Sequence, residues 1–213
     1  ISCGNEVIGV SRGKQKVEIY DKSGDKNEFD HVIFATHADS ILGLMSDSDL
    51  REQKAFLSWR YSANRVVLHT DSRLMPNNRR AWASWNFMSS HQDHHKSEVC
   101  VTYWMNSLQS LKTDKSFFVT LNPPVGIDIS GVIKEFIYKH PLFDNTALQA
   151  QSEIRSIQGY RNTWYCGSYM GYGFHEDALT SGLEAAKLLA HMGPPWQNSM
   201  NSLDSVATKM AFR

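Results

Sequence analysis

The stretch WYCGSYMGYGFHEDALTSGLEAAKLL, residues 164–189, decides which fold the sequence predicts. It begins as a short apolar run, passes through Gly167, Gly171 and Gly173, and then follows a helical pattern of Ala and Leu. A strand, a glycine-rich loop and a helix N-terminus in this order often bind phosphates or electron-rich ring atoms, because glycine admits a close ligand and the first helical N–H groups lack internal partners. The alternative is a tight strand–helix connection without a ligand, and spacing alone leaves both open.

The helical part of this stretch predicts a start between His175 and Asp177. Apolar residues recur in steps of three and four, which is typical of one buried helix face. That face is expected to contain Leu179, Leu183, Ala186 and Leu189 or Ala190. Gly182 beside it should allow close packing against a sheet. Glu176 and Asp177 complement the positive end of the helix dipole, which is a sufficient structural reason for both acids.

The remaining chain alternates predicted strands and helices. Runs rich in β-branched and aromatic residues predict strands at 6–10, 16–20, 31–35, 65–70, 81–87, 99–105 and 117–121. The first strands predict a three-stranded meander that leads into a central strand, HVIFA, which is apolar throughout and should be buried on both faces. Helices are expected at 38–45, 47–59 and 129–140, with a short helix or a loop at 144–154. Asp39 and Ser46 or Asp47 are the expected N-caps.

Composition excludes several classes of protein. The 213 residues contain 22 Lys plus Arg and 22 Asp plus Glu, so there is no basic field for nucleic acid or an anionic membrane. Three separated cysteines argue against a disulfide framework and favour a reducing, cytoplasmic location. No apolar run reaches the roughly 20 residues of a membrane span. The chain begins with Ile1 rather than Met, which suggests a fragment or a gene product without its usual start.

Two further kinds of chemistry are disfavoured. A metal site is not expected from His91, Asp93, His94 and His95, because neighbouring residues in a polar loop rarely point at one ion. A serine hydrolase is not expected either, because the sequence has no G-x-S-x-G elbow and Ser168 is followed by Tyr169.

A family resemblance covers residues 5–192 in order. The segments GSYMGYGFHEDALTSGLEAA and TYWMN carry it most specifically, and FDHVIFATHADSILGLM also fits. The first resembles the C-terminal flavin-binding segment of the FAD-dependent amine oxidase superfamily. The closer similarity is to a subgroup of flavin-containing amine oxidoreductases that is associated with, or fused to, cyclopropane fatty acid synthases.

The resemblance implies a mixed α/β flavoprotein with a discontinuous architecture. Residues 1–45 and 157–192 would form part of a doubly wound, Rossmann-like domain for FAD. Residues 46–156 would form an inserted, sheet-rich substrate domain, and 193–213 a tail. The residues that the resemblance places against FAD are Val7, Ala35, Thr36, Gly167, Ser168, Glu176, Asp177, Ala178 and Leu179.

The sequence departs from the family in one respect. Family members begin with a strand, a G-x-G-x-x-G loop and a helix, and this unit is missing here. Because that unit supplies most of the pyrophosphate cradle, we expect the 213-residue chain alone to bind FAD weakly or not at all.

Substrate residues are less clearly indicated. Trp82, Trp85, Tyr103 and Trp104 lie on neighbouring predicted strands and either wall a substrate cavity or form ordinary core. Asn86 and Asn106 could add polar contacts there, and His37 or His69 could take a proton. Arg60 and Arg65 are expected to pair with surface acids. No catalytic residue is assigned.

The resulting hypothesis is the C-terminal part of an FAD-dependent oxidoreductase. It would oxidise a C–N or C–C bond of a small molecule, an amine or a lipid, with hydride transfer to flavin. The alternative is a non-catalytic flavoprotein module that binds a lipid-modifying methyltransferase or cyclopropane synthase. A third possibility is a fragment that does not fold stably. The sequence assigns no substrate, electron acceptor or oligomeric state.

Overall fold

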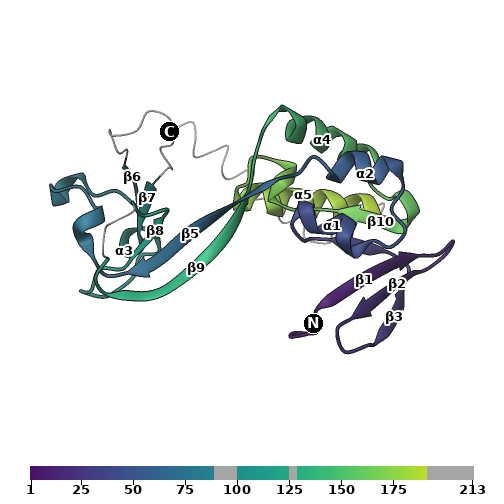
Figure 1. The fold of residues 1–213 in the computed structure, drawn as a ribbon, viewed down its shortest axis with the longest axis horizontal. Coiled ribbons are helices and arrows are strands. Elements are labelled where there is room, and N and C mark those ends of the chain that lie inside the picture. Colours follow the sequence, from purple (N-terminus) through teal and green to yellow (C-terminus); the bar gives the residue numbers. More distant parts are fainter. Residues whose placement is uncertain (89–99, 125–128, 191–213) are drawn as a thin grey trace, which may run out of the picture. The chain divides into compact units, whose positions relative to one another are not determined.

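The computed structural model describes residues 1–88, 100–124 and 129–190, which belong to two compact units (Figure 1). The first unit comprises residues 1–61 and the chain from Pro141, and the second comprises Ser62–His140. The first unit contains β1 (Val7–Arg12), β2 (Val17–Asp21), β3 (Lys26–Phe29), β4 (Val32–Phe34), α1 (Ala38–Leu44), α2 (Leu50–Phe56), α4 (Asn145–Ser156), β10 (Thr163–Tyr165) and α5 (His175–Ala190). The second contains most of β5 (Tyr61–His69) and β9 (Val132–Pro141), with β6 (Trp85–Met88), β7 (Cys100–Trp104), α3 (Met105–Leu108) and β8 (Phe118–Leu121).

The N-terminal meander is an antiparallel sheet in the order β1-β2-β3. Val10 and Val17 are its buried apolar residues, and Val10 forms a bridge with Met45 that attaches the sheet to the end of α1. β3 was not among the predicted strands, because all four of its residues are exposed and show no apolar alternation. The third strand of the meander is therefore 26–29, and HVIFA belongs to a different sheet.

That second sheet consists of β4 and β10, which run parallel. Val32, Phe34 and Tyr165 pack against α1, α2 and α4 on one face. Trp164 and Cys166 pack against Ala185 and Leu189 of α5 on the other. Helices on both faces of a parallel pair give the mixed α/β arrangement that the sequence predicts.

Burial of the central strand differs from the prediction. Val32 and Phe34 are buried, but Ile33 between them is 43% exposed. Ile33 shares its face with Trp164, which α5 covers, whereas no described element covers Ile33 itself. On the α5 side of the sheet, burial therefore falls on Trp164 of β10, and Ile33 of β4 stays partly exposed.

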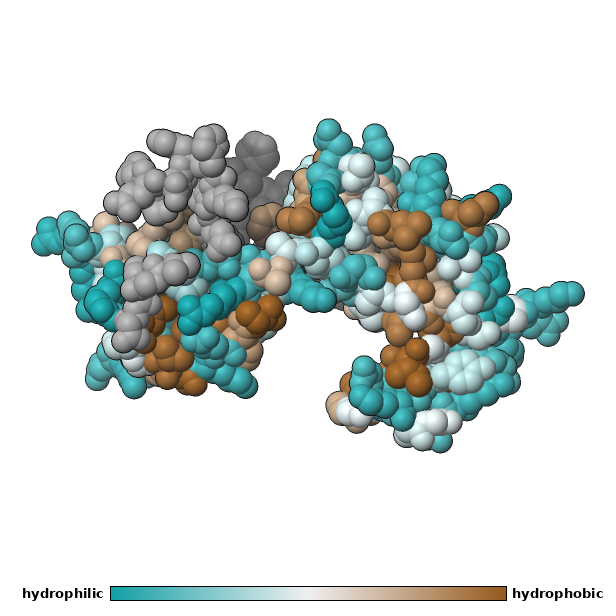
Figure 2. All heavy atoms as spheres, viewed as in Figure 1, coloured by the Kyte–Doolittle hydropathy of each residue, from teal (hydrophilic) through white to brown (hydrophobic). Residues whose placement is uncertain are grey.

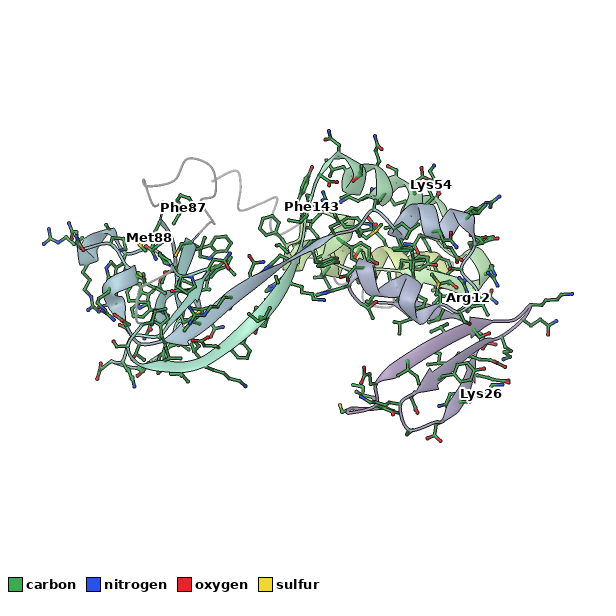
Figure 3. The ribbon with its side chains drawn as sticks, viewed as in Figure 1. Arg12, Lys26, Lys54, Phe87, Met88 and Phe143 are labelled. Carbon is green, nitrogen blue, oxygen red and sulfur yellow. The ribbon has the colours of Figure 1, made fainter. Side chains whose placement is uncertain are left out.

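A buried ion pair joins the meander to the helices and the parallel sheet. Arg12, at the end of β1 (Figure 3), directs its guanidinium at both carboxylate oxygens of Glu52 on α2, with Nη2 and Oε2 2.8 Å apart. Arg12 is 5% exposed and Glu52 is fully buried. Tyr165 on β10 donates to Glu52 at 3.2 Å, and Asp47 accepts from Arg12 Nε at 3.1 Å. Three separate elements thus share one pair of opposite charges.

The helix N-caps differ from those expected. α2 is capped by Asp49, whose carboxylate accepts from Arg51 and Glu52, while Glu52 accepts from the Asp49 N–H at 3.0 Å. Ser46 and Asp47 are not the cap, because α2 begins only at Leu50, and Asp47 binds Arg12. Asp39 lies in the first turn of α1 rather than at its cap, which is His37.

The second unit is a five-stranded sheet in the order β6-β7-β8-β5-β9. Its last strand corrects a prediction, because 129–140 was expected to be a helix and the structure has β9 there. Val132, Ile133, Phe136, Ile137 and Tyr138 are β-branched or aromatic residues that favour a strand once β5 offers an edge. The ambiguous segment 144–154 is helical and forms most of α4.

The unit boundaries also differ from the expected ones. We expected the inserted domain to span 46–156, but the compact second unit is shorter, Ser62–His140. α2 and α4 pack on each other in the core of the first unit, so they do not belong to the insertion. The proposed tail, 193–213, lies outside the described residues. Within the described part of the chain, none of the helices has the length and apolarity needed to cross a membrane.

The buried pair yields a prediction about stability. Glu52→Gln removes one charge and leaves the Arg12 guanidinium buried with less compensation, so we expect the free energy of unfolding to fall by about 3–5 kcal/mol. Urea unfolding followed by circular dichroism measures this change. The matched control is Glu153→Gln, which breaks an exposed pair with Lys54 and should cost no more than about 1 kcal/mol. Equal losses in the two variants would contradict the assigned role of Arg12–Glu52.

Candidate functional site

The carboxyl ends of β4 and β10 lie side by side at one edge of the parallel sheet. Tyr165 pairs with Phe34, and the Cys166 N–H donates to the Phe34 carbonyl at 2.9 Å. The segments that follow, Ala35–Thr36 and Gly167–Ser168, therefore leave the sheet at the same edge. In open α/β sheets this edge is where ligands bind.

The loop after β10 is held by side chains from α4 and α5. The Gly167 N–H donates to Ser181 Oγ at 2.9 Å. Gln151 Nε2 donates to the carbonyls of Tyr169 and Gly171, at 3.0 and 2.6 Å, and Arg155 donates to that of Met170 at 2.8 Å. These bonds satisfy the loop carbonyls inside the protein and fix the path from the strand to α5.

The three glycines are required by the chain's own packing. A Cβ on Gly167 would lie 2.5 Å from Cε1 of Tyr169, and one on Gly171 would lie 2.2 Å from Oδ1 of Asp177. Gly173 has φ of +93°, and a Cβ there would lie 3.1 Å from the Phe143 ring. The sequence suggested that glycines admit a ligand, but internal close contacts are sufficient to explain them. Cofactor contact at Gly167 stays a prediction.

The amino end of α5 begins at His175, as predicted. Asp177 Oδ2 accepts from the N–H groups of Tyr172 and Phe174, at 3.0 and 2.9 Å, so this carboxylate ties the loop to the first turn of α5. The first N–H bonded within the helix is that of Ala178, which donates to the Phe174 carbonyl at 3.2 Å. The N–H groups of His175, Glu176 and Asp177 have no partner among the described residues. They remain available to an electron-rich ligand atom.

The buried face of α5 is rotated from the predicted one. Ser181 and Ala185 are the buried residues, whereas Leu179 is 55% exposed. The Ser181 hydroxyl, bound to the Gly167 N–H, turns that side of the helix toward the sheet. Gly182 has no heavy atom within 4 Å of its would-be Cβ, so it does not serve close packing.

Exposed apolar residues surround this helix end. Tyr172 is 73% exposed and Phe174 is 59% exposed, and Leu179 lies one turn further on. Val7, the other residue expected near FAD, lies in the meander opposite Asp21, with 40% exposure. The structure thus gathers Ala35, Thr36, Gly167, Ser168 and the start of α5 around one sheet edge, and leaves Val7 in another sheet.

Tyr61 is a residue of this edge that the sequence did not single out. Its hydroxyl accepts from the Ala38 N–H at 2.9 Å, and its ring stacks on His37 with centroids 4.7 Å apart. Burial raises the pKa of Tyr61 to about 12, so the phenol keeps its proton at neutral pH. The sequence contains both partners of this contact, the segment His37-Ala38-Asp39 and the tyrosine that opens β5. Ala38 and Tyr61 are 23 residues apart, so the sequence pattern does not show that they meet.

His69, considered as a proton acceptor, is fully buried in the second unit. Its Nδ1 accepts from the Asp71 N–H at 3.2 Å, so Nε2 carries the proton and donates to Thr120 Oγ1 at 2.8 Å. Thr120 in turn lies 2.9 Å from Thr102 Oγ1. This polar row across β5, β8 and β7 holds the sheet register and cannot meet a substrate.

The four candidate cavity aromatics separate into two pairs on opposite faces of the sheet. Trp85 pairs with Tyr103 in register, with rings 5.4 Å apart, and Trp85 is 57% exposed. Trp82 packs on Trp104 at 5.3 Å and on Phe118, on the side of the polar row. The separation follows from the alternation of Tyr103 and Trp104 along β7. Trp82 and Trp104 are partly buried and pack on Phe118 and on each other, whereas Trp85 and Tyr103 lie on the other face, and substrate contact by either pair stays a prediction.

The polar candidates have structural partners. Arg60 pairs with Asp144 and Arg65 with Glu135, as expected for surface cations. Asn86 is buried and bonds the Ala83 and Thr102 backbone, while Asn106 bonds the backbone of residues 113, 115 and 117. The histidine-rich loop at 89–99 lies outside the described residues. In the part that is described, no group of three potential metal ligands is found.

Solved structures match the fold, although no protein-family model and no curated protein sequence matches the chain. A fatty acid isomerase from P. acnes that produces CLA aligns with a TM-score of 0.59 and 16% identity, over 88% of this chain and 47% of its own. Reduced UDP-galactopyranose mutase aligns with 0.62 and 10%, over 90% and 48%. A putrescine oxidase with redesigned cofactor binding aligns with 0.58 and 10%, over 88% and 48%.

These similarities support a mixed α/β fold that resembles part of flavoprotein oxidase structures. The chain spans about half the length of the solved structures that it matches.

Alanine substitutions of Gly167 and Gly182 should change the free energy of unfolding in opposite directions. Gly167→Ala places a methyl group against Tyr169 and should lower the free energy of unfolding by about 1–3 kcal/mol. Gly182→Ala, in the helix interior with open space around it, should raise that free energy by up to about 1 kcal/mol. Thermal and urea unfolding measure both. A neutral Gly167→Ala variant would show that Tyr169 does not fill this space.

His69 gives a prediction about pH. Burial lowers the pKa of His69, so the unfolded state binds its proton first. The stability that neutral His69 contributes is therefore present above the ordinary pKa of about 6.5 and is lost progressively as pH falls from that value toward the lower pKa of the folded state. Between pH 7.5 and 5.5, the free energy of unfolding should decline more steeply for the wild type than for His69→Gln. The difference cannot exceed about 1.4 kcal/mol per pH unit. Parallel pH profiles would contradict this assignment.

Proposed function

We propose that the chain is the C-terminal part of an FAD-dependent oxidoreductase and that the amino end of α5 contacts the flavin ring. The supporting observation is the row of unpartnered N–H groups at His175, Glu176 and Asp177, beside the carboxyl edge of β4 and β10. Such N–H groups stabilise negative charge, and flavin gains negative charge along one ring edge on reduction.

The residues present fit a flavin in part. The first turn of α5 offers donors, and exposed Phe174 and Tyr172 offer apolar surface for a flat ring. The loop carbonyls are already bonded internally, so they do not compete for those donors. When bound, FAD would supply the two-electron acceptor for a C–N or C–C bond. The chain's own contribution is to bind the ring and favour its reduced form.

Tyr61 and His37 are candidates for polar contact at the same edge. The Tyr61 hydroxyl accepts one hydrogen bond from Ala38, and its own proton is free to donate. A phenol is protonated near neutral pH, and burial raises the pKa of Tyr61 further, so it is a hydrogen-bond donor rather than a base. We therefore assign it a positioning role toward ligand and assign no proton abstraction to it.

The proposal predicts where FAD acts on the chain. Titration of the ¹⁵N-labelled 213-residue protein with FAD should shift the amide signals of Ala35, Thr36 and residues 175–179. We expect a Kd between about 10 μM and 1 mM, because only part of the cofactor would be contacted. His175→Pro removes one donor at a position where proline is compatible with a helix, and should weaken binding about tenfold.

The matched control is Leu50→Pro, a proline at the first position of α2, where it should leave FAD binding unchanged. No signal change at α5 with millimolar FAD would exclude the flavin site and favour a non-catalytic interaction module. Flavin that co-purifies at near-stoichiometric amount would instead show that the expectation of weak binding is wrong.

A further inference from the structure

One face of the second unit's sheet is apolar and open within the described part of that unit. We call it the aromatic face, and it is formed by Trp85, Phe87, Val101, Tyr103, Val119 and Leu121. The residues alternate along β6, β7 and β8 and are aligned by the registers Trp85–Tyr103, Phe87–Val101 and Tyr103–Val119. Trp85 is 57% exposed and Phe87 is 66% exposed, and the other four are partly exposed.

The opposite face of the same strands is closed by the unit itself. Asn86, Thr102 and Thr120 lie there and are buried. Met88, the neighbour of Phe87 on β6 (Figure 3), packs on that side against the cluster that contains Leu74 and Ile129. The unit's own turns therefore cover one face and leave the aromatic face without a described layer. Hydrophobic residues are visible at the surface of this unit in Figure 2.

The aromatic face continues onto β5 and β9. Asn64 Nδ2 lies 2.9 Å from His140 Nδ1, so these two side chains share a face of the sheet. Because side chains alternate with a period of two, Val66 and Leu68 follow Asn64, and Phe136 and Tyr138 precede His140 on that face. Val66 is only 4% exposed, so the face is closed at this point of β5. Phe136 and Tyr138 stack with centroids 5.4 Å apart. The result is an apolar band that crosses all five strands.

The charged residues on this band indicate which class of ligand it can bind. The strand residues that share the face include no Asp or Glu, since Glu135 lies on the other side with Arg65. Lys134 shares the face and lies over the Phe136 ring at 5.0 Å. A diamine would meet no carboxylate here, and a nucleotide sugar would meet few hydrogen-bond donors. A hydrocarbon chain with an anionic or neutral head group is complementary to the band.

We propose that the aromatic face binds the linear hydrocarbon chain of a fatty-acid-type substrate. This rests on the proposed function, because the bound chain is a substrate only if the flavin site exists. The face itself does not require flavin to bind such a chain. Because each methylene buried on the apolar band adds to the binding free energy, affinity should grow with chain length, by up to about fourfold for each buried methylene.

The test uses three ten-carbon probes below their aggregation concentrations: decanoate, decanol and 1,10-diaminodecane. Calorimetric titration of the 213-residue protein should show that decanoate and decanol bind and that the diamine binds at least tenfold more weakly. Octanoate should bind about three- to fifteenfold more weakly than decanoate. Phe87→Glu places a charge on the exposed face and should weaken decanoate binding at least tenfold. Leu50→Glu, at an apolar residue with 82% exposure in the first unit, should not change it.

Three outcomes would overturn the proposal. The first is preferential binding of the diamine, and the second is decanoate binding that Phe87→Glu does not alter. The third is a dimer in light scattering that Phe87→Glu converts to a monomer, because a second copy would then occupy the face. Decanoate binding together with no FAD binding would keep hydrocarbon binding at the aromatic face, remove its assignment as a substrate and reject the flavin proposal, so the two can fail separately.

Discussion

The paired charges of Arg12 and Glu52 join three elements of the first unit at one buried point. Burying a guanidinium or a carboxylate costs desolvation free energy, and only their mutual pairing compensates that cost. Here Arg12 comes from the meander, Glu52 from α2, and Tyr165 of β10 adds a hydrogen bond to the carboxylate. Glu52 also completes the capping box of its own helix. The position of the parallel strands, and so of the candidate site at their ends, depends on this one junction.

The candidate site combines internal order with unused donors. Gln151, Arg155 and Ser181 bind the backbone of the loop after β10, and Asp177 binds its N–H groups. The glycines allow this compact path because Tyr169 and Asp177 occupy the space of their missing side chains. The loop's polar groups are thus largely satisfied, whereas the first N–H groups of α5 are not. That difference supports a ligand at the helix end rather than in the loop.

The two faces of the second unit's sheet differ in character. The buried row of Asn86, Thr102, Thr120 and His69 satisfies its polar groups across neighbouring strands, which opposes a shift of register. With the register held, every second residue of β6, β7 and β8 is presented on the aromatic face. An open apolar surface can then keep its shape without a covering layer of the same unit.

The sequence by itself determined the elements whose signals are local. The glycine loop, the start of α5 at His175, most strands and the pairing of Arg60 and Arg65 with acids could be predicted because spacing and charge report them directly. The structure decided what depends on distant partners. β9 is a strand because β5 offers an edge, although its residues also suit a helix, and Asp47 is drawn to Arg12 of β1 rather than to a helix end. Likewise the hydrogen bond between the Gly167 N–H and Ser181 sets which face of α5 is buried. Tyr103 and Trp104 lie on opposite faces of the sheet because they are neighbours on one strand. A local pattern specifies what a segment can become, and only the surfaces brought against it in three dimensions select the outcome.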